Sequence, residues 1–294
     1  MTTALGLLHG LDFLLSAWLI GAIVFHCLIV KAGGPEAEAL IPDWPRKAAF
    51  LAALTFFSSF LWMLLTASDM AESWKPADLW IAISQTQFGH IWCLRLVLLL
   101  LIFILARFIR PPRKAIFSGL AVLLPLASAL TGHAGASEIR LALHLGVDWS
   151  HSIAVAVWTG GLWTLRAWLG QRLSLNALGS QTGVRVVRRF SHFAVTSTFV
   201  IAITGIVMAY FAGVSLVQPW EKIYGQIALA KLLFFCAALG AAAVNQFFHL
   251  RTWNSENDRQ TTMRLRREVS IELVLIVIVF GLAGFLTRTS LPID

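Results

Sequence analysis

The chain has 294 residues, of which 58% are hydrophobic and only 13% are charged, and its mean hydropathy is +0.76. Soluble domains carry roughly 25% charged residues, so this composition excludes a soluble fold of this length, which would need a charged surface. The net charge of +8 does not indicate a nucleic-acid-binding protein, because the basic residues lie mostly between apolar stretches. We therefore expect an integral membrane protein that binds lipid and no nucleic acid.

Apolar stretches long enough to span a membrane recur along the whole chain. A hydrocarbon core of about 30 Å requires roughly 20 residues of apolar helix. The stretches are too long for barrel strands and lack their alternation of polar and apolar residues. The predicted spans cover residues 5–30, 47–70, 89–110, 115–133, 141–169, 185–213, 225–250 and 267–288. The predicted fold class is an all-α, polytopic membrane helical bundle of about eight transmembrane helices, a single membrane domain over residues 1–294.

Lysine and arginine are distributed unevenly between the two ends of these predicted helices. The loops after the first, third, fifth and seventh spans carry seventeen basic residues: Lys31, Arg46, Lys47, Arg107, Arg110, Arg113, Lys114, Arg166, Arg172, Arg185, Arg188, Arg189, Arg251, Arg259, Arg264, Arg266 and Arg267. The opposite side carries four: Lys75, Arg140, Lys222 and Arg288. Because basic loops stay in the cytoplasm, we expect both termini on the outer side of the membrane.

Several ionisable residues lie toward the outer ends of the predicted spans. Such a residue is costly inside a membrane, so it usually faces the bundle interior and marks a binding site or a pathway. His9 and Asp12 lie one turn apart in the first span. His90 opens the third span and His133 closes the fourth. Each is a candidate for the site, although an interfacial or hydrogen-bonded histidine without a ligand would give the same pattern.

The fifth predicted span carries the most informative pattern. His144, Asp148 and His151 follow one another at intervals of four and three residues. At 3.6 residues per turn the three side chains fall within about 60° of arc, and therefore on one face of the helix. Imidazole and carboxylate groups on one inward face can bind a metal, relay protons or hold haem. Asp148 could also orient a histidine rather than bind the ligand itself.

A sparser polar layer lies toward the inner side. His192 is in the sixth span, Asn245 in the seventh and Glu272 in the eighth, and Glu272 with Asn245 is the preferred polar pair. Two basic residues, Arg95 and Lys231, lie within spans. We expect these two either to pair with carboxylates or to extend their charges to the membrane surface.

At these residues the chain resembles the bacterial copper resistance protein D (CopD) family of inner-membrane proteins. The resemblance spans nearly the whole chain. It depends on the order and spacing of several motifs, and no single motif establishes it. The motifs are Gln85-Thr86-Gln87-Phe88-Gly89-His90-Ile91-Trp92, Gly132-His133-Ala134, His144 with Asp148 and His151, Ala156-Val157-Trp158-Thr159-Gly160-Gly161-Leu162, Arg189-Phe190-Ser191, Tyr224-Gly225, Ala230-Lys231-Leu232, Asn245 and Glu272.

The resemblance implies copper uptake across the inner membrane and a role in copper homeostasis or resistance, with no enzymatic activity. The candidate metal ligands are then His9, Asp12, His133, His144, Asp148 and His151, and His90, His192, Asn245 and Glu272 are candidates for the pathway. Members of the family often act with a small periplasmic copper-binding protein, CopC, which here would be a separate chain. Two alternatives stay open: a b-type cytochrome that holds haem b between histidines at matching depths, and a structural or sensory membrane component that binds nothing.

Overall fold

The structure is a computed structural model that describes residues 2–109, 114–131, 141–178, 181–214, 218–244, 258–287 and 289. The described chain consists of helices joined by short turns, and it contains no strand. The long helices are α1 (Thr2–Val24), α3 (Trp44–Ala71), α5 (Gln87–Phe108), α6 (Lys114–Thr131), α7 (Leu141–Val155), α8 (Gly161–Ser174), α9 (Thr182–Phe211), α10 (Ile223–Val244) and α11 (Asp258–Leu286). The short elements are η1 (Phe25–Ile29), η2 (Val30–Gly33), α2 (Pro35–Ala39), α4 (Pro76–Ser84) and η3 (Ala156–Gly160).

The expected membrane helical bundle is confirmed. Within the described residues six helices are long and apolar enough to cross a membrane, namely α1 with η1 and η2, α3, α5, α9, α10 and α11. The shorter apolar helix α6 and the continuous helical segment α7–η3–α8 are the remaining candidates, so the count of eight stays a prediction. Large apolar side chains such as Phe57, Phe199 and Leu233 are exposed, as a lipid-facing surface requires.

Two short helices, α2 and α4, lie between the predicted spans and were not predicted. Pro35 and Pro76 each stand in the first turn of a helix, α2 and α4, where the missing N–H of proline costs no hydrogen bond. Thr86 caps the N-terminus of helix α5, because its hydroxyl oxygen accepts a hydrogen bond from the Gly89 N–H at 3.1 Å. Helix α11 begins at Asp258, more than two turns before the predicted start at residue 267.

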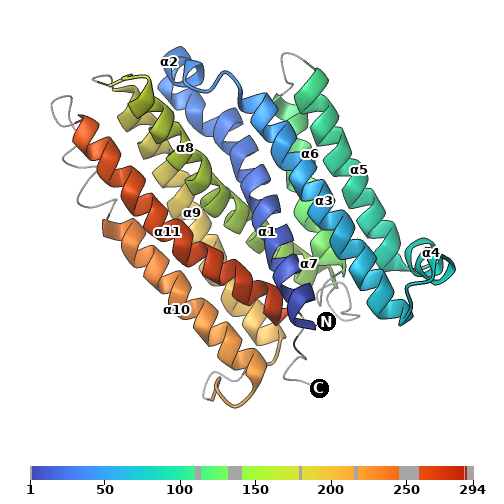
Figure 1. The fold of residues 1–294 in the computed structure, drawn as a ribbon. Coiled ribbons are helices and arrows are strands. Elements are labelled where there is room, and N and C mark those ends of the chain that lie inside the picture. The colour runs from blue at the N-terminus through green and yellow to red at the C-terminus, as the bar shows by residue number, and fades with distance from the viewer. Residues whose placement is uncertain are drawn as a thin grey trace.

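Helix α1 occupies the middle of the bundle (Figure 1). It contacts α3, α6, α7, α8 and α11, and its residues Leu19 and Ile23 are fully buried. In Figure 1 α4 and α5 lie on one flank of α1, and α10 and α11 lie on the other. Residues of α1 are therefore in a position to meet polar groups from both halves of the chain.

Small residues allow α1 to approach its neighbours closely. A side chain on Gly160 of η3 would collide with the Ala17 carbonyl, and one on Gly21 would collide with the backbone of Gly160. At the other end of α1, a Cβ on Gly10 would lie 2.7 Å from the Phe280 carbonyl oxygen of α11. Close backbone approach at small residues is a principal means of helix association in membranes. The start of α1 therefore lies beside the end of α11, at the same end of the bundle.

Candidate functional site

The predicted polar face of α7 lies against other helices of the bundle. The His144 ring stacks on Phe211 of α9, with the ring centroids 3.9 Å apart. The Nδ1 atom of His151 lies 2.9 Å from the Thr204 hydroxyl, also on α9. Both histidines are half-buried. The face that the four- and three-residue spacing predicted is thus turned toward protein.

The hydrogen bonds of Thr204 determine which nitrogen of His151 carries the proton. The Thr204 hydroxyl has a single hydrogen, and it donates this hydrogen to the backbone carbonyls one turn earlier, chiefly that of Val200. Its oxygen must then accept from an Nδ1–H of His151. This tautomer leaves the lone pair of the ring on Nε2, and the backbone of Ile201 is a second hydrogen-bond partner of the imidazole. A neutral imidazole held through one nitrogen and open at the other is the usual form of a histidine metal ligand.

Asp148 completes the α7 face and is half-buried. Two side chains of α10, Lys231 and Tyr224, lie within electrostatic range of its carboxylate. Lys231 is also within range of His151. No ion pair of 4 Å or less joins Lys231 to Asp148 among the described residues. The α7 face therefore lies between α9, which orients His151, and a cation on α10.

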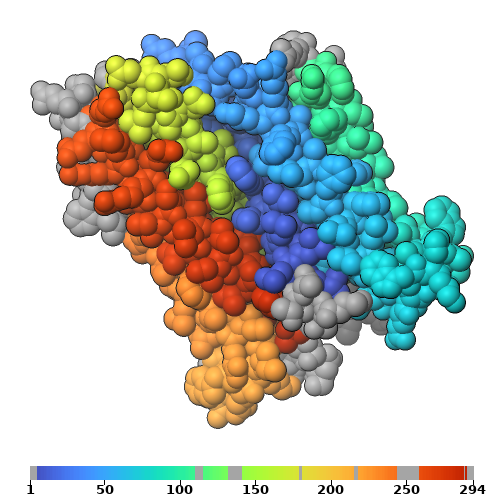
Figure 2. All heavy atoms as spheres, viewed as in Figure 1, coloured from blue at the N-terminus to red at the C-terminus, as the bar shows by residue number. Residues whose placement is uncertain are grey.

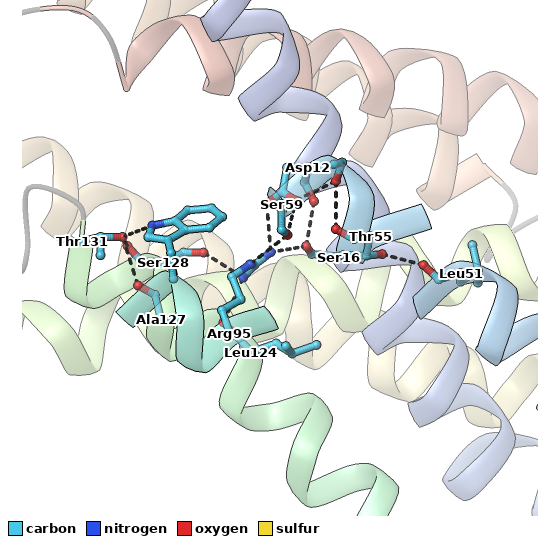
Figure 3. A network of polar contacts seen from close by, with 12 residues as sticks. Asp12, Ser16, Leu51, Thr55, Ser59, Arg95, Leu124, Ala127, Ser128 and Thr131 are labelled. Carbon is cyan, nitrogen blue, oxygen red and sulfur yellow. Dashed lines mark hydrogen bonds and ion pairs between the residues drawn. The ribbon is translucent and has the colours of Figure 1, made fainter. Parts of the chain in front are cut away.

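Asp12, a predicted ligand, lies in a different polar cluster, which joins α1, α3, α5 and α6 (Figure 3). One carboxylate oxygen of Asp12 accepts hydrogen bonds from Ser58 at 2.7 Å and Ser59 at 2.6 Å. The other forms an ion pair with Arg95 at 2.9 Å. Both charged side chains are buried, with exposed fractions of 1% for Arg95 and 0% for Asp12. Arg95 therefore pairs with a carboxylate, the first of the two expected arrangements.

Arg95 makes further hydrogen bonds that use the rest of its guanidinium group. Its Nη1 donates to the Leu124 carbonyl and to the Ser128 hydroxyl of α6, each at 3.1 Å. Its Nη2 also donates to Ser16 at 2.6 Å, and its Nε to Ser59 at 3.2 Å. A buried ion pair is tolerable only when such bonds satisfy the remaining polar atoms. The Asp12 carboxylate is thus occupied by protein donors, an arrangement that holds four helices together.

His9 lies one turn from Asp12 in an aromatic environment. Its ring stacks on Trp62 of α3 with the centroids 4.1 Å apart, and it also contacts Phe13. The side chain is 8% exposed. These contacts hold the ring in the α1–α3 interface, near the start of α1.

The remaining predicted residues are dispersed. The His90 ring is exposed, and its Nε2 donates to the Ser84 carbonyl at 2.7 Å, which ties α5 to the end of α4. His192 is exposed on α9, whereas Glu272 is buried on α11 with an exposed fraction of 2%. His133 and Asn245 lie outside the described residues, so the predicted pair of Glu272 with Asn245 stays a prediction.

The part of the chain that the structure describes contains no group of three or more His, Cys, Asp or Glu residues close enough to hold a metal ion. The α7 face supplies His151 and Asp148, with His144 one turn away. Thr204 was not predicted as a member of this site because it lies in no motif, and Tyr224 was noted only as part of the Tyr224-Gly225 motif. Lys231 had been noted as a basic residue within a span and as part of the Ala230-Lys231-Leu232 motif, but not as a member of the site.

Most of the chain is similar in sequence to known proteins. The family model of the copper resistance protein D-like N-terminal domain matches residues 1–143, and that of copper resistance protein D matches residues 184–286. The copper transport protein CutJ of Bacillus subtilis is 28% identical over 241 residues, which cover 76% of this chain and 42% of CutJ. The inner membrane protein YebZ of Escherichia coli is 26% identical over 244 residues, which cover 76% of this chain and 81% of YebZ.

The chain thus spans less than half the length of CutJ. No solved structure is significantly similar to it. Two family models of copper resistance protein D match the N-terminal and the C-terminal parts of the chain, which include the motifs around His90 and Lys231. His144, Asp148 and His151 lie between the two matched ranges. The chain belongs to the copper resistance protein D family.

Proposed function

We propose that this protein carries copper into the cell across the bacterial inner membrane and that the α7 face binds the ion during passage. The chain is a multi-pass inner-membrane protein of a copper-related family. A relative that is similar over 76% of this chain is named a copper transport protein. The observation that carries the proposal is the contact of His151 Nδ1 with the Thr204 hydroxyl, which itself donates to the Val200 carbonyl, because this arrangement leaves Nε2 as the nitrogen with a lone pair.

The chemistry of the α7 face suits copper as a transported ion. Imidazole binds copper in either oxidation state, and the carboxylate of Asp148 supplies a negative charge beside it. Lys231, which lies within range of that carboxylate, balances its charge when copper is absent. Copper entering the site would take over this role if the ammonium group of Lys231 gave up its proton at the same time, so that no positive charge would be added beside Asp148 by a monovalent ion.

The outer side of the membrane is where copper would arrive, delivered by a separate periplasmic protein of the CopC type. His144 lies in the first turn of α7, at the end of the bundle where α1 begins, and His151 lies two turns deeper. The ion would then continue past Glu272, which is buried on α11. The haem alternative has no comparable support, because the described histidines contact aromatic rings, Thr204 and Ser84 rather than facing one another in pairs.

Copper accumulation in cells that express the protein tests this proposal. His151→Ala should abolish most of the protein-dependent accumulation, since it removes the ligand nitrogen. Thr204→Val should also reduce accumulation, but by less. Loss of a residue that hydrogen-bonds a metal ligand typically lowers metal affinity by roughly 10–100-fold. Thr198→Val is the matched control: Thr198 is on the same helix, is half-buried like His151 and bonds its own helix backbone, at the Val195 carbonyl. Unchanged accumulation in a well-expressed His151→Ala variant would refute the role of the α7 face.

A further inference from the structure

A basic cavity lies between α8 and α11, far from the α7 face. Its volume is about 250 Å³, and it is lined by Arg166, Leu173, Met263, Arg266, Arg267 and Ser270. Figure 2 shows the two helices side by side on one face of the molecule, α8 in yellow-green and α11 in orange-red. The cavity would hold roughly eight water molecules at about 30 Å³ each, which is enough for a phosphate group with its neighbouring atoms.

One of the three arginines is held in place by a fixed hydrogen-bond chain. Arg166 Nε donates to the Ser270 hydroxyl at 2.7 Å, and that hydroxyl donates to the Arg266 carbonyl, also at 2.7 Å. The Ser270 oxygen is therefore oriented as an acceptor for Arg166. These hydrogen bonds use only the Nε atom of Arg166, so the two terminal nitrogens of its guanidinium group can bind a ligand.

The second arginine lies over a glycine. A Cβ on Gly170 of α8 would lie 3.3 Å from Arg266 Nε and 3.5 Å from its Cζ, so the missing side chain makes room for the guanidinium group. Neither Arg266 nor Arg267 forms an ion pair with a carboxylate in the described chain. Three guanidinium groups thus converge on one cavity without a neutralising anion in its lining. Arginine forks match the geometry of phosphate oxygens, which they bind in pairs.

The surroundings of the cavity favour a ligand that carries both a phosphate group and a hydrocarbon chain. Arg267 continues along α11 into exposed apolar residues at helical spacing, namely Ile271, Val274 and Ile278. These residues form a stripe that leads from the arginines into the hydrocarbon region. Leu173 and Met263 add apolar walls beside the charges. By the distribution of basic residues, this end of the bundle faces the cytoplasm.

We propose that the Arg166–Arg266–Arg267 cavity binds the phosphate of an anionic phospholipid from the cytoplasmic leaflet, with an acyl chain along the Ile271–Ile278 stripe of α11. Basic pockets between transmembrane helices on the cytoplasmic side are known to recognise such headgroups. The site is independent of copper transport, since none of its residues lies on the α7 face.

The test compares lipids that remain bound to the purified full-length protein by mass spectrometry, after exchange into mixed phosphatidylglycerol and phosphatidylcholine. Phosphatidylglycerol should be retained selectively by the unmodified protein. Arg266→Gln with Arg267→Gln should reduce this retention at least about tenfold, since each arginine near the surface contributes on the order of 1 kcal/mol. The matched control is Arg259→Gln with Arg264→Gln, which removes the same charge from exposed positions of the same helix outside the cavity.

A second variant separates a shaped site from general electrostatic attraction. Gly170→Val keeps every charge but fills the space under Arg266, so it should also reduce phosphatidylglycerol retention. Equal phosphatidylglycerol retention by the Arg266→Gln/Arg267→Gln and Arg259→Gln/Arg264→Gln variants would overturn the proposal. Unchanged phosphatidylglycerol retention in Gly170→Val would also overturn it. Displacement of the lipid by millimolar glycerol 3-phosphate would assign the site to a soluble phosphate compound and overturn its assignment to a lipid.

Discussion

Arg95→Met is expected to lower the free energy of unfolding by about 3–5 kcal/mol, because it leaves the carboxylate of Asp12 buried without its counter-ion. The side chain of Asp12 is fully buried, so it cannot regain water. The substitution also removes the hydrogen bonds from Arg95 to Ser16, Ser59 and Ser128 and to the Leu124 carbonyl. Thermal or denaturant unfolding of the protein in detergent measures the effect.

The double variant Asp12→Asn with Arg95→Met tests whether the two side chains stabilise the protein as an ion pair or independently of each other. Its loss of unfolding free energy should be smaller than the sum of the losses in the two single variants, because neither substitution then leaves an unpaired charge buried in the bundle. The control is Arg107→Met, which removes an exposed arginine from the same helix and should change stability by less than about 0.5 kcal/mol. If Arg95→Met unfolds under the same conditions as Arg107→Met, the cluster does not hold the four helices together.

Gly160→Ala is expected to destabilise the protein by about 1–3 kcal/mol or more, although alanine favours helices. The added methyl group would collide with the Ala17 carbonyl of α1, and no flexible side chain can move aside at this backbone contact. Separation of α1 from η3 would relieve the collision but open the centre of the bundle. The midpoint of thermal unfolding measures the loss.

Gly146→Ala is the matched control for this prediction. Gly146 lies in α7, on the same continuous helical segment, and a Cβ there would meet no atom within 4 Å. This control should be neutral or stabilising by about 0.5–1 kcal/mol, the ordinary advantage of alanine over glycine in a helix. Equal effects of the two substitutions would show that α1 is not packed against η3 in the way described.

The sequence predicted those features that depend on a single helix. Hydrophobic length located the membrane helices, and helical spacing predicted that His144, Asp148 and His151 share one face. Interactions between helices were not predictable in the same way, because periodicity gives the face of a helix but not its neighbour. Arg95 was expected to pair with a carboxylate, yet nothing in the sequence indicated that Asp12, rather than another acidic residue, would be its partner.

The same reason explains what was missed around the α7 face. Thr204 orients His151 only because α9 packs beside α7, and an isolated threonine in an apolar helix carries no signal of this role. Lys231 approaches Asp148 from α10, a helix distant in the sequence. The π-helical turn η3 was also absent from the prediction, since no composition rule distinguishes its five residues from an α-helix.

Copper bound per molecule of purified protein, read together with the visible absorption spectrum of the same sample, tests the account most directly. We expect stoichiometric copper in the unmodified protein, its loss from His151→Ala, and no Soret band. A sample that has been equilibrated with copper and retains none, or one with a Soret band that sharpens on reduction, would contradict copper transport through this bundle.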